Sequence, residues 1–177
     1  LWDRRYGFMN KALTSPISRS AIAIGKMSAI SLIAALQASL IIGIALAIGV
    51  TFPNPLMIIP IMGIVILFSL GFSGISVTLA ATAKSQETFW GMINLLGMPL
   101  FMLSPALFPL ELLPSWLAVI AKLNPVTYTI LLVRELMTGV SEGGVPILLS
   151  IGVILAFVIA MVAIASYVFT REVNKPF

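Results

Sequence analysis

The longest segment without charge in this sequence lies between Lys26 and Lys84. As one helix it would be about 85 Å long, whereas the hydrocarbon core of a bilayer is about 30 Å thick. The segment must therefore fold back on itself, and the turn signal near its middle is Pro53-Asn54-Pro55. We predict two membrane-spanning helices here, over residues 24–50 and 56–80.

The composition fits a membrane protein with several spans. Of the 177 residues, 60% are hydrophobic and 9% are charged, and a soluble domain of this length could not bury so much apolar surface. The sequence has no cysteine and no histidine, which excludes disulfides, thiolate metal sites and the commonest general base. The predicted fold class is all-α, a polytopic membrane protein.

Two further uncharged runs are long enough to cross a bilayer. The run 88–110 contains Pro99, and it predicts a kinked span over residues 89–103. The run 143–170 predicts a fourth span over residues 146–170.

The basic residues orient these four spans. Eight of them would share one side of the membrane: Arg4, Arg5, Lys11, Arg19, Lys26, Lys84, Arg171 and Lys175. Two would lie on the other side, Lys122 and Arg134. Since Lys and Arg are enriched in cytoplasmic loops, segments 1–20 and 171–177 are predicted to be cytoplasmic and 104–142 to face outward. The protein is thus predicted to be a multi-pass protein of the plasma membrane with both ends of this chain in the cytoplasm.

The outward segment is too apolar for a solvated loop and too interrupted for a span. Four prolines disfavour helix in the residues before them: Pro105, Pro109, Pro114 and Pro125. The uncharged runs 112–121 and 123–133 each reach about half a bilayer thickness. We predict a proline-broken helical hairpin in the interface or re-entering the membrane, with Trp116 and Tyr128 at interfacial depth. An apolar connecting loop is the alternative.

Residues 1–20, which precede the first predicted span, contain several charged residues. Apolar residues recur at helical spacing, namely Trp2, Tyr6, Met9 and Leu13, while the charged residues occupy other faces. This pattern predicts an amphipathic helix against the membrane or a partner. Ser15 followed by Pro16 predicts an N-cap and the first position of the next helix. Because the chain opens without an initiator Met or a first span, we expect it to be part of a longer subunit.

Ionisable residues give no sign of catalysis. None of the six acidic residues lies within a predicted span, which argues against an enzyme and against an ion-coupled carrier. The net charge of +4 reflects basic residues that flank apolar runs, so no nucleic-acid partner is predicted.

Small and weakly polar residues in the spans have two interpretations. Gly71, Ser73 and Gly74 predict close helix packing. A polar or adaptable lining of a transport pathway is the second interpretation, and its candidates are Gln37, Asn94, Met98 and Met102. Ordinary helix packing is the alternative for these four as well.

Two stretches resemble one family. Residues 4–19, followed by Gly25-Lys26, resemble the cytoplasmic loop of type-2 ATP-binding-cassette exporter permeases, in which a charged helix and a Pro-x-Ser-Arg turn precede the third span. Residues 107–117 and 123–128, with Arg134, resemble the outward hairpin between the fifth and sixth spans. The chain is similar to daunorubicin-resistance-like drug exporters, as the C-terminal four spans of a six-span subunit.

The resemblance implies outward transport of a drug-like, lipid or other amphiphilic substrate by alternating access. ATP and Mg would bind a separate cytoplasmic ATPase subunit, so this chain is expected to be no enzyme and to hold no cofactor. A second permease subunit, identical or different, would complete the pathway within the membrane lipids. The residues implied in ATPase coupling are Arg4, Arg5, Gly7, Lys11, Pro16 and Arg19. Those implied in the outward hairpin are Phe108, Pro109, Glu111, Pro114, Trp116, Asn124, Pro125, Tyr128 and Arg134.

Three alternatives remain open at the level of sequence. A permease for polysaccharide or lipid-linked glycan shares the same fold. A channel or secondary carrier would need mid-membrane charge in spans outside this chain. An intramembrane enzyme fits least, because histidine, cysteine and acids within the spans are missing.

The predicted topology can be tested by labelling, since the sequence has no cysteine. Single-cysteine variants at Lys84 and Lys175 should resist an impermeant thiol reagent in intact cells, whereas one at Lys122 should react. Reaction of position 84 from outside would contradict the predicted orientation.

Overall fold

The computed structural model describes residues 18–141 and 143–173. Every regular element in this part of the chain is helical: α3 (Arg19–Ala47), η1 (Pro55–Met57), α4 (Ile58–Thr82), α5 (Gln86–Met102), η2 (Leu110–Leu112), α6 (Ser115–Leu123), α7 (Pro125–Thr138) and α8 (Ile147–Val173). The all-α polytopic fold class is confirmed.

Local sequence signals set where the first two long helices begin and end. The Ser18 hydroxyl caps α3 by accepting a hydrogen bond from the Ala21 amide. Helix α3 therefore starts at Arg19; Ser15 and Pro16, where the sequence predicts a helix start, lie outside the described residues. Beyond α3 the chain turns at Gly49, whose φ of +91° suits glycine. Asn54 then caps η1, as the predicted Pro-Asn-Pro turn requires.

Among the described residues, three helices are long and apolar enough to cross a membrane: α3, α4 together with η1, and α8. A fourth crossing exists if α6 and α7, which meet at a bend of 88°, count as one broken span. Helix α5 occupies the predicted third span but has only 17 residues, about 26 Å. It ends at Met102 because Pro105 disfavours further helix before it.

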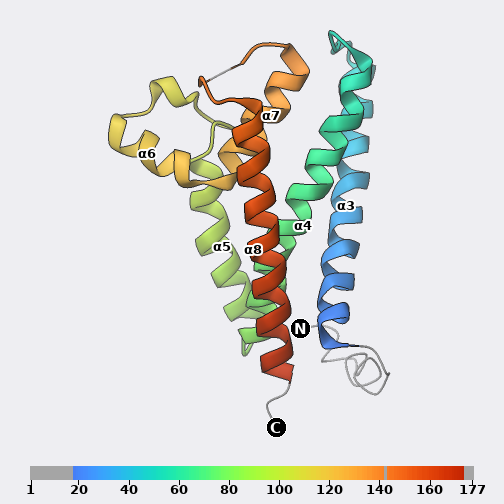
Figure 1. The fold of residues 1–177 in the computed structure, drawn as a ribbon, viewed down its shortest axis with the longest axis vertical. Helices are drawn as coiled ribbons and strands as arrows, with labels where there is room; N and C mark the ends of the chain where they lie inside the picture. The colour runs from blue at the N-terminus through green and yellow to red at the C-terminus, as the bar shows by residue number, and fades with distance from the viewer. Residues whose placement is uncertain (1–17, 142, 174–177) are drawn as a thin grey trace.

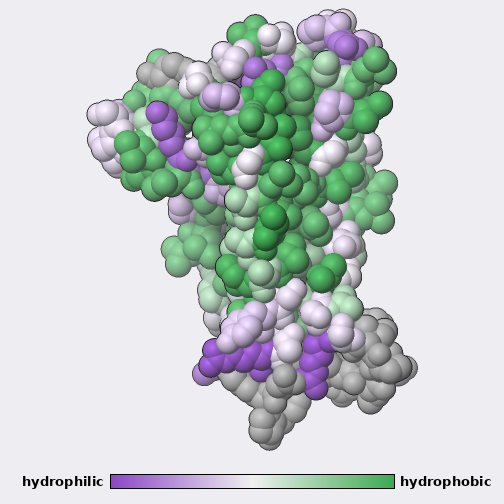
Figure 2. All heavy atoms as spheres, viewed as in Figure 1, coloured by the Kyte–Doolittle hydropathy of each residue, from purple (hydrophilic) through white to green (hydrophobic). Residues whose placement is uncertain are grey.

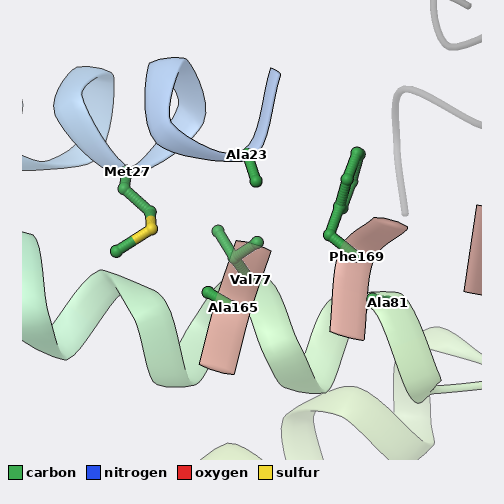
Figure 3. Packing of buried hydrophobic residues seen from close by; sticks show 6 residues of the cluster. All are labelled: Ala23, Met27, Val77, Ala81, Ala165 and Phe169. Carbon is green, nitrogen blue, oxygen red and sulfur yellow. The ribbon is translucent and has the colours of Figure 1, made fainter. Parts of the chain in front are cut away.

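The long helices form one packed bundle. Helices α3, α4 and α8 contact one another along the long axis of the molecule (Figure 1). One cluster of buried residues joins all three helices: Ala23, Met27, Val77, Ala81, Ala165 and Phe169 (Figure 3). A second cluster, Leu132, Ile154 and Val158, ties α7 to α8, with α4 packed against it.

Helices α4 and α8 approach so closely that glycine is required between them. A Cβ atom on Gly74 would lie 2.9 Å from the Met161 carbonyl oxygen, and one on Gly71 would lie 3.0 Å from Phe157 and Val158. The helix packing predicted for Gly71 and Gly74 is therefore confirmed.

Serine hydroxyls join α3 to α4 within the bundle. Ser31 donates to the Ile66 carbonyl at 2.7 Å and pairs with the Ser69 hydroxyl at 2.8 Å. Ser73 donates within α4 to the Leu70 carbonyl at 2.7 Å and approaches the Met27 carbonyl at 3.4 Å. Such bonds across helices satisfy polar groups that hydrocarbon cannot.

We predict that Gly74→Ala destabilises the bundle by about 1–3 kcal/mol, because the added methyl group meets backbone that cannot move aside. Thermal unfolding of the full-length protein in detergent measures this. The matched control is Gly63→Ala on the same helix, where nothing lies within 4 Å of the new Cβ. Equal stability of the two variants would contradict the close α4–α8 contact.

Candidate functional site

The segment between α5 and α8 forms the predicted hairpin at one end of the bundle. Helix α6 lies across the direction of the long helices, whereas α7 runs along α8 (Figure 1). Figure 2 shows an apolar band over the middle of the molecule, with polar residues gathered toward both ends. A hairpin with two short helices is thus present. Side chains inside the hairpin form hydrogen bonds to backbone groups at the helix ends.

Asn124 connects three helices at the hinge of the hairpin. Its Oδ1 accepts from the Val126 amide at 3.0 Å and so caps α7, in which Pro125 takes the first position. Its Nδ2 donates to the Leu100 carbonyl at 2.6 Å, in the last turn of α5. The residue is only 5% exposed. One amide therefore caps the start of α7 and the end of α5.

Two further side chains of α7 satisfy the end of α6. Thr127 Oγ1 donates to the Ala121 carbonyl at 2.7 Å, and Tyr128 OH donates to the Lys122 carbonyl at 2.7 Å. The last carbonyls of a helix have no partner within the helix, and an apolar surrounding offers none. Side chains of the Asn-Pro-x-Thr-Tyr motif thus donate hydrogen bonds to carbonyls at the ends of α5 and α6, the two helices that precede it.

A second connection joins α7 to the chain after α5. Arg134 Nη2 donates to the Pro105 carbonyl at 3.1 Å. Ser104 Oγ donates to the Phe101 carbonyl at 2.6 Å and accepts from the Ala106 amide at 3.4 Å. Ser104 and Pro105 are both fully buried. The chain from the end of α5 to Pro105 is therefore bonded to α7 at two points, at its start by Asn124 and further along the helix by Arg134.

The outer surface of the hairpin is apolar. Helix α6 is the first of the two short helices in this hairpin. The large side chains exposed on and beside it are Leu107, Phe108, Leu112, Trp116, Val119, Ile120 and Leu123. Exposed apolar area of this kind suits lipid or another protein.

The prolines of the hairpin motif lie at helix starts. Pro109 precedes η2, and Pro114 precedes α6 with its φ of −53°. Glu111 lies within η2, but its side chain falls outside the described part.

The other predicted site residues are scattered. Arg4, Arg5, Gly7, Lys11 and Pro16 lie outside the described residues, and Arg19 is the first residue of α3. Asn94, Met98 and Met102 are exposed along α5, none of whose side chains is buried. Gln37 is exposed on α3, which lies across α8 from α5 (Figure 1). Their roles in coupling and in a pathway stay predictions.

An open pocket of about 370 Å³ lies along α7. The pocket lining therefore combines one arginine with apolar and hydroxyl side chains. The lining residues are Thr129, Ile130, Val133, Arg134, Met137 and Thr138. In the described part of the chain, no group of three His, Cys, Asp or Glu side chains could hold a metal.

We predict that Asn124→Ser loosens the end of α5, because serine retains an acceptor for the α7 cap but cannot reach the Leu100 carbonyl. Amide hydrogen exchange over residues 100–106 should rise by about tenfold, as expected for one buried hydrogen bond. Asn54→Ser is the control, since Asn54 makes only a local cap to Leu56. Unchanged exchange in Asn124→Ser would contradict the tie between α5 and α7.

Comparisons with known proteins cover most of the chain. Residues 1–138 match the family model described as ABC-2 type transporter. Three similar proteins are ycf38 proteins, whose name describes them as transport permeases. The protein of Cyanophora paradoxa is 33% identical over 77% of this chain, that of Pyropia yezoensis 31% over 80%, and that of Porphyra purpurea 32% over 73%.

The chain spans about half the length of these relatives: 47%, 49% and 45%, respectively. No solved structure matches it with significance. Because the family model covers most of the chain, the chain belongs to the ABC-2 type transporter family of membrane permeases.

Proposed function

We propose that this chain is the membrane-spanning part of an ATP-driven exporter that moves a drug-like, lipid or other amphiphilic substrate out of the cell. ATP is hydrolysed in a separate ATPase subunit at the cytoplasmic side. The match of residues 1–138 to the ABC-2 type transporter family carries this proposal. The names of the three relatives, as transport permeases, support a role in transport.

A pathway shared by two permease subunits is part of the proposal. Its support is the exposed length of α5, where Leu95 is 73% exposed and Met98 is 65% exposed. Asn94 adds an amide to the same helix. A second subunit beside α5 would enclose a transport pathway lined by these apolar, thioether and amide groups. Such a lining suits substrates of varied shape.

The pocket along α7 supports an amphiphilic substrate. Ile130, Val133 and Met137 offer apolar contact, while Arg134 sets a cation beside them. Since α7 is tied to the end of α5 through Asn124, a substrate in this pocket would contact the same element that closes the hairpin. The hairpin then acts as the outward lid of the pathway.

Coupling to the ATPase is assigned to the basic entry segment. We predict that the double reversal Arg4→Glu with Arg5→Glu, in the full-length subunit, releases the ATPase subunit or lowers the rate of ATP-dependent export at least tenfold. The reason is that acidic side chains repel the acidic surface with which arginine would pair. Copurification of the ATPase and uptake of a fluorescent amphiphile into inside-out vesicles measure both effects.

The control for this prediction is Lys122→Glu, a reversal at the hairpin end of the bundle, which should keep ATPase association. If the Arg4 and Arg5 reversals left association and export unchanged, the coupling role would be wrong. If vesicles with both wild-type subunits showed no ATP-dependent uptake of any amphiphile tested, the export function itself would fail.

A further inference from the structure

Gln37 is the only amide side chain of α3, and it lies near the middle of that helix. Helix α3 has 29 residues, about 44 Å, and Gln37 is about 27 Å from its start. If α3 is centred in a hydrocarbon core of about 30 Å, the amide lies about 5 Å from the middle of the bilayer. The depth of this side chain is therefore that of hydrocarbon, not of headgroups or water.

The Gln37 amide is exposed, and it makes no hydrogen bond within the part of the chain that the structure describes. Hydroxyl side chains nearby behave differently: Ser39 donates to the Leu36 carbonyl of its own helix at 2.8 Å, and Ser69 donates to the Ile66 carbonyl at 3.0 Å. A primary amide has two N–H donors and an oxygen acceptor, and acyl chains offer partners for neither. The amide therefore needs a partner that the described residues do not supply.

The side chains around Gln37 form a continuous apolar face. Those three, four or seven residues away lie on its side of the helix: Ile30, Ile33, Ile41 and Ile44. Each is between 40% and 65% exposed. The face extends over about four helical turns, with one hydrogen-bonding group at its centre. Apolar side chains around a single polar group are typical of the contact between two membrane helices.

The opposite side of α3 is the one that meets the bundle. Met27 and Ser31 are buried there, and Ser31 is bonded to the Ile66 carbonyl of α4. Leu32 lines a groove on that side together with Ile66 of α4. Leu32 and Ile41 are nine residues apart, which is two and a half turns, so they point in opposite directions. The face that contains Gln37 is thus separate from the contact between α3 and α4.

We propose that a membrane-spanning helix from the part of the subunit outside these 177 residues packs on the Gln37 face of α3. Its contribution is a hydroxyl or amide side chain, which can both accept from the Gln37 Nε2 and donate to its Oε1. The relatives have enough chain for such a helix, because the matched region spans 47%, 49% and 45% of their lengths. The contact would fix that helix in depth and rotation against α3.

The position of α3 favours a helix of the same subunit over a second copy. The proposed function assigns the second permease subunit to α5, which lies across α8 from α3 (Figure 1). The choice of occupant rests on that assignment, whereas the need for a hydrogen-bonding partner does not. A helix in the same polypeptide also stays close to α3 through the chain that connects them, which raises its effective concentration.

The first test identifies what covers this face in the full-length subunit in native membranes. A photo-crosslinking amino acid replaces Ile41, one turn from Gln37, which itself stays intact. After illumination, mass spectrometry should find a crosslink to a peptide from outside these 177 residues, in a product with the mass of one subunit. The matched control has the same amino acid at Leu32, on the opposite side of α3, and should give at least tenfold less of this crosslink. A product with the mass of two subunits, or crosslinks to lipid alone, would overturn the proposal.

The second test uses the sign of a stability change. Gln37→Leu should lower the ratio of folded to unfolded full-length subunit about threefold, as expected for one hydrogen bond between membrane helices. Ser39→Ala is the control and should leave the ratio nearly unchanged, because its hydroxyl bonds only within α3. Unfolding in mixed detergent measures the ratio. A higher ratio in Gln37→Leu would mean that the amide faces lipid, and a ratio equal to that of Ser39→Ala would mean that it has no partner; either result would overturn the proposal. Neither test involves ATP or transport, so the outcome is independent of whether export itself is observed.

Discussion

Backbone carbonyls at helix ends impose the main constraint on this structure. Helices α5 and α6 both end where the chain turns within an apolar surrounding, so their last carbonyls need donors from elsewhere. Asn124, Thr127 and Tyr128 provide those donors from the first turn of α7. Because the three lie within five residues, the position of α7 determines how α5 and α6 end, and the hairpin follows as a single hydrogen-bonded unit.

The bundle and α5 differ in how they are held. Helices α4 and α8 meet with backbone in contact at Gly74, and the hydroxyl of Ser31 joins α3 to α4. Helix α5 has no buried side chain and is attached at its two ends, by the short loop from α4 and by the Asn124 bond. Side-chain packing therefore constrains α5 less than it constrains the three helices of the bundle.

The two ends of the bundle have different chemistry. The hairpin end presents apolar side chains such as Trp116 around a polar interior of helix caps. The opposite end gathers Arg19, Lys84 and Arg171, and it holds a buried guanidinium atom without a partner. In the exporter proposed above, the first end would meet the substrate and the second the ATPase subunit.

The sequence by itself determined the fold class and the turn between the first two long helices, because charge and proline mark membrane boundaries whatever the packing. The run between Lys26 and Lys84 and the turn at Asn54 appear in the structure as α3, η1 and α4. Only the tertiary structure decided that α5 stays open and that Ser104, Pro105 and Thr127 belong to the site. These features depend on which distant carbonyl a side chain reaches, as Asn124 reaches Leu100, and no local pattern of residues encodes that distance.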